Sequence, residues 1–464
     1  MGRALAHWRL FRLRLASYPP TWAPLQQRIK SHDETPRVKR ARETHAESAG
    51  TPARRAALRL LDAVLRKGLP LDAALASATA GIDRPDDRAL AHAIAAEVLR
   101  RLPDLDALID SATARPLPDD AKARFALRIA LVQVLVLGTP PHAAIATALP
   151  LVDGGPRKLV HGVFGALMRS GALLPEPPNL PPAADMRWEA AWGEEVAEAA
   201  RGAIAAPPPL DLTLADWSAT DKWAGELGGT SLMPGHVRLE RSGNVREMPG
   251  FEEGAWWVQD LAASLPARLI GKGAGTALDL CAAPGGKTLQ LASACWDVTA
   301  LDASESRLAR LSDNLARTSL SAKVVAADLL RWSPESPAEA VLLDAPCSAT
   351  GIFRRHPDVL HRVTGVTIAE MAELQTRLLA RAAEWVKPGG ALVYATCSLE
   401  RAEGEEQLDA FLGTRADFTV DPIRADELPA GLAATEGGWL RTLPGMLAEQ
   451  GGCDGFFMVR MRRG

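Results

Sequence analysis

Apolar residues recur every three or four positions through residues 51–172, as they do along one face of an amphipathic helix. Thr51 and Pro52 suit the N-cap and the first turn of the first such helix. Further helical patterns cover 88–102, 122–137 and 155–167. Proline-rich loops separate these patterns. Together they predict an all-α domain at 51–172, and nothing in it indicates catalysis.

From Thr276 onward the pattern changes, and short apolar runs alternate with helical segments. The strand-like runs cover 276–280, 298–301, 323–326, 340–343 and 391–395, and the clearest helices cover 304–318 and 367–386. Such alternation predicts a parallel, doubly wound sheet of the Rossmann-like α/β class. The run FFMVRMR at 456–462 predicts a late strand that pairs with a neighbour as a hairpin edge.

The segment between these two patterns predicts a domain boundary. Five prolines within 173–185 make a stiff linker. Residues 186–265 mix helical stretches at 188–205 with short strand-like runs, and this mixture predicts a small α/β subdomain. The α/β sheet domain then occupies 266–464.

Composition adds the class of protein. The chain has 464 residues, of which 47% are hydrophobic and 23% charged, so it is globular and large enough for several domains. No apolar run is long enough to span a membrane. Its five cysteines form no C-x-x-C pair and no Cys/His set with metal spacing. We therefore expect free thiols in the cytoplasm, no membrane anchor and no metal site.

Charge is distributed unevenly along the chain. The net charge is −3, but residues 1–50 contain ten Lys or Arg and four Asp or Glu and so carry +6. Such a segment can contact nucleic acid electrostatically. We expect either a disordered basic extension or a start codon placed too far upstream.

The stretch TALDLCAAPGGKT, at 276–288, has the form of a strand that turns through a glycine loop into a helix. Three cofactors compete for such a turn. The dinucleotide pattern G-x-G-x-x-G is absent, and a P-loop would need glycine where Cys281 stands. S-adenosylmethionine is the third, and Asp302, which ends the next strand, is placed for its ribose hydroxyls. An ordinary strand-to-helix turn remains an alternative.

Two further strand ends carry thiols. Asp344-Ala-Pro-Cys347-Ser348 follows one strand, and Thr396-Cys397-Ser398 follows another. A single buried cysteine is usually a small apolar residue. Two cysteines, each at the carboxyl end of a strand and each followed by serine, favour nucleophilic chemistry in the crevice that also holds the cofactor.

Four blocks stand in order along the chain: LDLCAAPGGKT, LDAPCSATGIFRRHPDV, YATCS and CDGFF. Residues 250–464 thereby resemble the Sun-type RNA cytosine-C5 methyltransferases. Segments such as RRAALRLLDAV and RALAHAIAAEVLRRL resemble the NusB-like RNA-binding domain. The combined arrangement is similar to that of RsmB-type small-subunit rRNA methyltransferases. One departure is Ala349, where glycine is common.

The resemblance implies a class I methyltransferase domain that uses S-adenosylmethionine, and it implies roles for residues. Cys397 would attack the base, Cys347 would assist product release, Asp344 would contact the base edge and Lys287 would lie in the active site. The residues implied for the cofactor are Cys281, Ala282, Ala283, Pro284, Gly285, Gly286, Lys287, Asp302 on the ribose, Asp328 near the adenine, and Asp344.

The same loop and the same resemblance suggest the partner. Arg354, Arg355 and His356, just past Cys347, are placed to hold flanking phosphates of RNA. The RNA would be small-subunit rRNA or its assembly intermediate, bound by a monomer. Two alternatives remain open at this point: a P-loop-like NTPase, and a non-catalytic NusB-like RNA-binding factor.

Overall fold

The computed structural model describes residues 50–240 and 243–464. The basic extension predicted for 1–50 lies outside these residues, apart from Gly50. Among the helices of the described residues, none is both long enough and apolar enough to cross a membrane.

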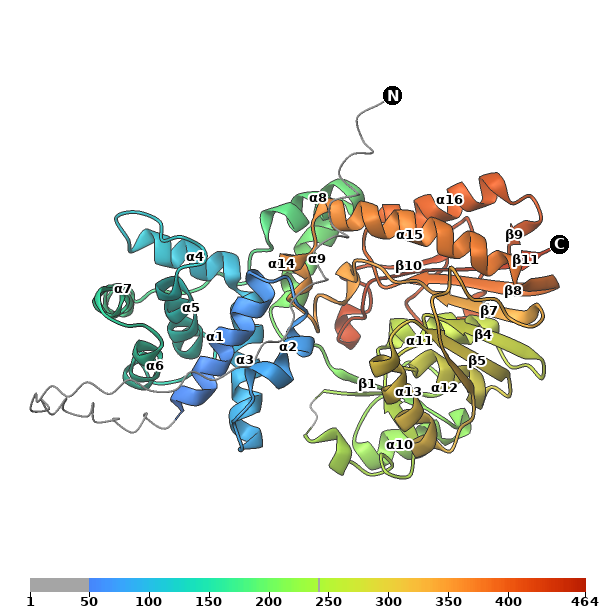
Figure 1. The fold of residues 1–464 in the computed structure, drawn as a ribbon, viewed down its shortest axis with the longest axis horizontal. Coiled ribbons are helices and arrows are strands. Elements are labelled where there is room, and N and C mark those ends of the chain that lie inside the picture. The colour runs from blue at the N-terminus through green and yellow to red at the C-terminus, as the bar shows by residue number, and fades with distance from the viewer. Residues whose placement is uncertain (1–49, 241–242) are drawn as a thin grey trace, which may run out of the picture. The chain divides into compact units, whose positions relative to one another are not determined.

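The first part of the described chain is all helical, as predicted (Figure 1). Its helices are α1 (Thr51–Leu65), α2 (Leu71–Ala78), α3 (Pro85–Arg100), α4 (Leu102–Ser111), α5 (Lys122–Leu135), α6 (Pro141–Ala148) and α7 (Gly155–Arg169). Helix α5 is the centre of the bundle, because every side chain from Ala123 to Gln133 is buried. Its apolar residues share one core with those of α1, α3 and α7.

Two details of the helical region differ from the prediction. Gly50 is the N-cap of α1, and Thr51 is its first helical residue. The pattern at 88–102 is two helices, because α3 ends at Arg100 and α4 begins at Leu102, with Pro103 in its first turn. Proline is well tolerated in a first turn but not in a helix interior, so it marks the new start.

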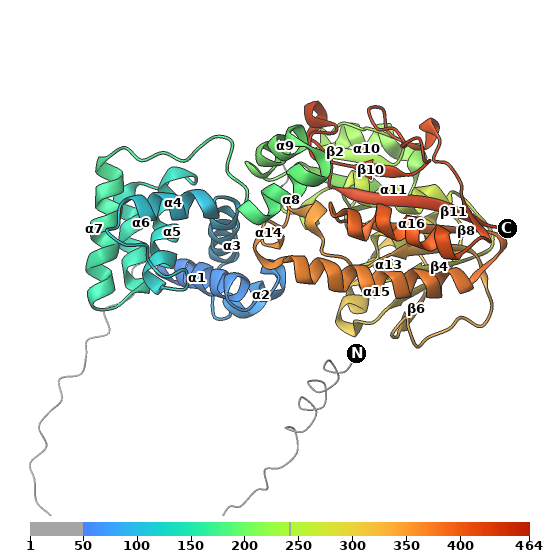
Figure 2. The same ribbon diagram turned by 90° about the horizontal axis from the view of Figure 1, so that it is seen from above.

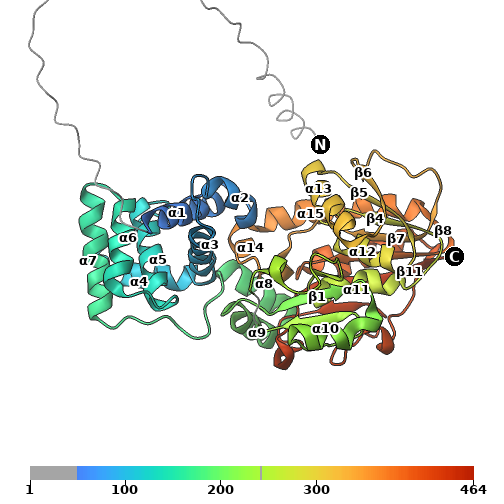
Figure 3. The ribbon, with the colours of Figure 1, turned by 90° about the horizontal axis from the view of Figure 1, so that it is seen from below.

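A small antiparallel sheet follows, in the order β2-β1-β3. Two helices precede it, α8 (Pro182–Trp192) and α9 (Glu194–Ile204). The strands are β1 (Leu210–Leu214), β2 (His236–Leu239) and β3 (Trp256–Val258), and α10 (Thr220–Leu227) connects β1 to β2. The helical stretches predicted at 188–205 are α8 and α9, which are separated at Gly193, whose positive φ of 88° ends α8. Figure 3 shows β1 beside α11, and the two elements are in contact.

The main sheet has eight strands, of which seven follow the order β10-β11-β8-β7-β4-β5-β6 while β9 pairs with β11. The strands are β4 (Thr276–Leu280), β5 (Asp297–Asp302), β6 (Lys323–Ala326), β7 (Ala338–Asp344), β8 (Val386–Thr396), β9 (Phe418–Val420), β10 (Leu440–Thr442) and β11 (Phe456–Arg463). Strands β4 to β8 are parallel, as predicted.

The late strand predicted at 456–462 is confirmed as β11, and it pairs with the preceding strand β10, but its predicted place at the edge of the sheet is wrong. Strand β11 lies inside the sheet, antiparallel to β8 on one side and to β10 and β9 on the other. Its side chains from Phe456 to Met461 are buried, as an interior strand requires.

Helices cover both faces of the main sheet. On one face lie α11 (Leu261–Ile270), α12 (Gly286–Ser293) and α13 (Glu305–Thr318). On the other lie α15 (Gly365–Glu384) and α16 (Glu405–Thr414), which Figure 2 shows side by side. The strand ends between these layers form the edge where doubly wound folds bind ligands.

The helical domain touches the loop that leaves this edge. Helix α14 (Val359–Arg362) packs against α1. The buried Arg100 donates a hydrogen bond of 2.7 Å to the carbonyl of Arg354, and the backbone N–H of Leu71 donates to Asp358 at 3.3 Å. The loop after Cys347 is therefore held by the helical domain as well as by the sheet.

Candidate active site

Two cysteine side chains meet at the carboxyl edge of the main sheet. Cys347 follows β7 and Cys397 follows β8, and these strands are parallel neighbours. Their sulfur atoms are 3.4 Å apart, and both side chains are only partly buried. The hydrogen bond between the thiols, together with burial, raises the pKa of Cys347 well above its usual range. The predicted convergence of the two thiols is confirmed.

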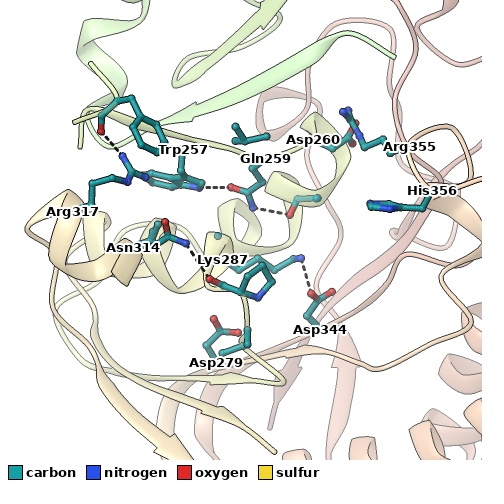
Figure 4. Close-up of a pocket in the computed structure, with 18 residues that line it drawn as sticks. Trp257, Gln259, Asp260, Asp279, Lys287, Asn314, Arg317, Asp344, Arg355 and His356 are labelled. Carbon is teal, nitrogen blue, oxygen red and sulfur yellow. Dashed lines mark hydrogen bonds and ion pairs between the residues drawn. The ribbon is translucent and has the colours of Figure 1, made fainter. Parts of the chain in front are cut away.

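Beside the thiols, Lys287 and Asp344 form an ion pair (Figure 4). Lys287 lies in the first turn of α12 and Asp344 ends β7, with 2.7 Å between Nζ and Oδ2. Burial alone would lower the pKa of the Lys287 ammonium, but the Asp344 carboxylate outweighs burial and the pKa is raised. The pair therefore keeps a cation next to the cysteines.

The glycine loop is fixed by Asp302. Its Oδ2 accepts a hydrogen bond from the backbone N–H of Ala283 at 3.2 Å, and its Oδ1 accepts one from Ser304 at 2.9 Å. Cys281, at the start of the loop, has a left-handed φ of 63°. Asp328, after β6, is more than half exposed and accepts a hydrogen bond from the backbone of Leu330. The strand ends thus bring the predicted cofactor residues to one edge.

A cavity of about 470 Å³ opens on one side of the ion pair (Figure 4). The glycine loop, Lys287 and Asp344 line one wall, and Trp257 and Gln259 line the other. Arg355 and His356 lie at its rim, on the side of Asp344. The cavity therefore connects the cofactor loop to the loop predicted to bind RNA.

One buried carboxylate in this cavity lacks a full set of partners. Asp279, in β4, is fully buried, and its Oδ2 accepts a hydrogen bond of 2.5 Å from Thr288. Its Oδ1 has no partner among the described residues. Burial raises the pKa of this carboxyl to about 7. An orphaned acceptor beside the glycine loop fits a ligand that carries an amino group, such as the amino-acid end of S-adenosylmethionine.

The two predicted phosphate-binding arginines are engaged in ion pairs. Arg354 is buried, with Nε 3.4 Å from Asp454 and Nη2 3.8 Å from Asp260. Arg355 lies 2.6 Å from Asp260 and 3.1 Å from Asp454, and these carboxylates raise its pKa against the effect of burial. His356 is the most exposed of the three, at 38%. A contact between Arg354 and phosphate would require it to leave these partners.

The sequence did not single out Trp257 and Gln259. The indole N–H of Trp257 donates a hydrogen bond of 2.8 Å to Gln259, which in turn donates to Gln290 at 2.9 Å. The sequence did contain a signal for Gln259. This residue directly follows the apolar strand β3, just as other site residues directly follow strands of the main sheet. Within the residues that the structure describes, no cluster of three or more His, Cys, Asp or Glu side chains is arranged to hold a metal.

Comparison with known proteins identifies the family. The profile of the 16S rRNA methyltransferase RsmB/F family matches residues 269–462, and that of the NusB family matches 51–169. The chain is 38% identical to ribosomal RNA small subunit methyltransferase B of Xylella fastidiosa over 89% of this chain and 98% of that one. It is 37% identical to the protein of that name from Xanthomonas campestris, over 88% and 97%. The chain belongs to the RsmB/F family of methyltransferases.

Solved structures agree with the fold. The protein PH0851 superposes with a TM-score of 0.70 and 23% identity over 90% of this chain and 99% of its own. A methyltransferase homologue from Pyrococcus horikoshii gives a TM-score of 0.51 with 26% identity, over 60% and 93%. Both support the Rossmann-like fold of the catalytic domain.

Membership of the family settles the class of enzyme and its cofactor. The chain is an RNA methyltransferase that uses S-adenosylmethionine. The two alternatives left open by the sequence, a P-loop-like NTPase and a non-catalytic NusB-like factor, are therefore set aside. The residues present fit the cofactor, since an orphaned carboxylate and the strand-end aspartates surround the glycine loop.

Proposed function

We propose that the chain methylates C5 of cytosine in small-subunit ribosomal RNA through a covalent bond between the Cys397 sulfur and cytosine C6. The observation that carries this proposal is the position of two thiols 3.4 Å apart beside the Lys287–Asp344 pair. Cytosine C5 is a poor nucleophile, and addition of a thiolate to C6 makes it electron-rich.

Cys397 is the attacking residue in this scheme. The Lys287 ammonium interacts with it electrostatically, and a neighbouring cation favours a thiolate. When the C5 proton later passes to solvent, the C5–C6 double bond forms again, the C6–sulfur bond breaks and the thiolate leaves. Cys347 assists this release, and its raised pKa suits a thiol that carries a proton at the time it acts.

Asp344 and Lys287 bind and orient the cytosine base. Adding a thiolate places negative charge in the ring, and a hydrogen bond at N3 stabilises this charge. Asp344 accepts a hydrogen bond from the amino group on this edge of the base, and through the ion pair it holds the Lys287 ammonium close enough to stabilise the charge. Bound S-adenosylmethionine supplies the electrophilic methyl group.

The cofactor lies against residues 281–287. Asp302 holds the ribose hydroxyls, Asp328 lies near the adenine, and Asp279 accepts a hydrogen bond from the amino group. Asp302 already accepts two backbone hydrogen bonds, but each carboxylate oxygen can accept another.

The RNA enters with the target base unpaired or flipped out, since a stacked base cannot present C6 to a thiolate. Its flanking phosphates are held by His356 and by Arg355 and Arg354 where these can exchange their present partners. The NusB-like domain selects the RNA, and the protein works as a monomer in the cytoplasm on rRNA or an assembly intermediate.

Bisulfite sequencing of total RNA tests the proposal. A strain that lacks this gene should lose protection at one cytosine of small-subunit rRNA, and the wild-type gene should restore it. A variant with Cys397→Ala should fail to restore it. Unchanged protection in the deletion strain would overturn the assigned substrate.

A further inference from the structure

The serines that follow the two cysteines converge on one carboxylate. The hydroxyls of Ser348 and Ser398 both donate hydrogen bonds to Oε2 of Glu403, and they lie 3.1 Å from each other. The backbone N–H of Ser348 donates to Oε1 of the same carboxylate at 2.8 Å. Each cysteine loop is therefore joined to Glu403 by the residue directly after its thiol.

Glu403 is itself held rigidly. It ends a short 3₁₀ turn (Arg401–Glu403) and is fully buried. Gln375 of α15 donates a hydrogen bond of 3.1 Å to its carboxylate, and the hydroxyl of Tyr394 donates one of 2.9 Å to its carbonyl. Its carboxylate is thus satisfied by neutral donors, and the loss of any of them would leave a buried anion short of hydrogen bonds.

This arrangement couples the two cysteine loops. A movement of the Cys347 loop away from the Cys397 loop would break hydrogen bonds at Oε2 from one side and leave the buried charge poorly compensated. The spacing between the thiols therefore depends on a residue that touches neither sulfur.

The negative charge of Glu403 also acts on the thiol of Cys347. After the hydrogen bond with Cys397 and burial, Glu403 adds to the increase in the pKa of Cys347. The Lys287 ammonium interacts electrostatically with Cys397. The other ionisable groups that face this cluster are Asp344, Tyr394, Glu405 and Arg441.

We propose that Glu403 is a positioning residue that holds both cysteine loops at their working distance and places a buried negative charge against the Cys347 loop. The proposal rests on the function proposed above and adds to it a residue that distinguishes the surroundings of the two adjacent thiols.

Glu403→Gln tests the electrostatic half of the proposal. A glutamine can accept the Ser348 N–H and donate to the hydroxyls, so the geometry is retained while the charge is lost. We expect iodoacetamide to alkylate Cys347 at least about threefold faster than in the wild type near pH 8. Peptide mass spectrometry assigns the modified cysteine. An unchanged rate at Cys347 would overturn this half.

Glu403→Ala tests the positioning half. We expect kcat to fall at least about tenfold, with KM for RNA and the Kd of S-adenosylmethionine within about twofold of the wild type. Glu403→Gln should retain more of kcat than Glu403→Ala does. A kcat of Glu403→Ala within about twofold of wild type would overturn the proposal, and if this variant does not fold, the Glu403→Gln measurements decide it.

Glu400→Gln is the matched control. Glu400 is also buried and lies three residues away, but its carboxylate contacts Trp188 and Arg187 of α8. It should change neither the alkylation of Cys347 nor kcat. Because the alkylation assay needs no RNA, wild-type protein that failed to methylate RNA would refute the proposed function, while the alkylation of Cys347 would still test Glu403.

Discussion

The Lys287 ammonium and the Asp344 carboxylate lie 2.7 Å apart, although 57 residues separate them in the chain. Lys287 is almost buried, with 11% of its side chain exposed, and its ammonium also lies 5.5 Å from the centre of the Phe456 ring. Asp344 is what keeps this buried lysine charged, because its attraction exceeds the effect of burial. Lys287 therefore depends on Asp344 for its charge.

Asp344→Asn should lower the pKa of Lys287 below its usual range, since burial is the largest single effect and only the weaker attractions of Cys397 and Asp279 would then oppose it. NMR of ¹³C-labelled lysine side chains measures this change. We expect kcat to fall by about a hundredfold as well, because a charged contact with the base is lost. Glu335→Gln, which removes an exposed partner of Lys323 at 3.5 Å, is the control and should change neither value. A Lys287 that titrates normally in Asp344→Asn would contradict the coupling.

Substitution of each cysteine should distinguish the roles of the two thiols, because one acts before methyl transfer and the other after it. Cys397→Ala should form no covalent adduct and transfer no methyl group, because the nucleophile is missing. Cys347→Ala should still attack and methylate, then stall with RNA attached. Denaturing electrophoresis would show the stalled species as a protein–RNA band.

The double variant with both cysteines replaced should lack this band, and Cys295→Ala, at an exposed thiol, should behave as wild type. The opposite result, a stable band in Cys397→Ala and none in Cys347→Ala, would exchange the two roles.

Asp302→Ala should weaken binding of S-adenosylmethionine at least about tenfold, because charge-assisted hydrogen bonds to the ribose contribute about 1.5–3 kcal/mol each. The same substitution also frees the N–H of Ala283, so part of the loss reflects the loop. Asp302→Asn, which can still accept that bond, should lose less. Calorimetry measures both affinities. Asp297→Ala, at the exposed start of β5, should bind normally, and an unchanged affinity of Asp302→Ala would remove Asp302 from the cofactor site.

The sequence located the catalytic sheet well because its strands are marked by short apolar runs. The runs at Thr276–Leu280 and Lys323–Ala326 coincide with β4 and β6. The hydrophobic pattern of a strand indicates that it is buried but not which strands lie beside it. For this reason the predicted position of β11 at the edge of the sheet was wrong. Strands β9 and β10 were not predicted, because three residues are too few to show a period.

The sequence predicted only those site residues that lie together in one short continuous segment. The glycine loop and both cysteine blocks could be recognised as continuous stretches. Asp454 and Glu403 could not, since each acts through contacts between segments that are distant in the chain, such as Asp454 with Arg354. The sequence places charged residues on a loop, but their ion-pair partners are set by tertiary packing.

Ala349 stands where the family resemblance leads us to expect glycine, and its backbone conformation shows why glycine would suit this position. Its φ of 58° lies in the left-handed region, where glycine has no steric penalty and other residues lose about 1–2 kcal/mol. Ala349→Gly relieves this strain but adds backbone freedom to the unfolded chain. We therefore expect the free energy of unfolding, measured in urea, to stay constant or rise by up to about 1 kcal/mol.

Ala410→Gly provides the comparison, because Ala410 lies on the exposed side of α16 in ordinary helical geometry. It should lose about 0.5–1 kcal/mol. Equal losses at the two positions would mean that the backbone at Ala349 is not strained.

Asp279 should make stability depend on pH in the protein without cofactor. Burial raises its pKa to about 7 in the folded state, whereas an unfolded aspartate titrates near about 3.9. The folded state therefore binds the proton more tightly, so this contribution to stability is complete below about pH 4 and is lost as the pH rises towards about 7.

Asp279→Asn cannot ionise, so its stability should increase relative to the wild type by about 1.4 kcal/mol per pH unit between about pH 5 and 7, and the difference should level off above that. Urea titrations across this range measure the difference, in which the contributions of other groups cancel. Thr288→Val provides a second check. It removes the hydrogen bond that lowers the pKa of Asp279, so the levelling should move to higher pH. Parallel stability curves for Asp279→Asn and wild type would mean that Asp279 is ionised in the folded protein throughout this range, and that the pocket beside the glycine loop already accommodates its charge.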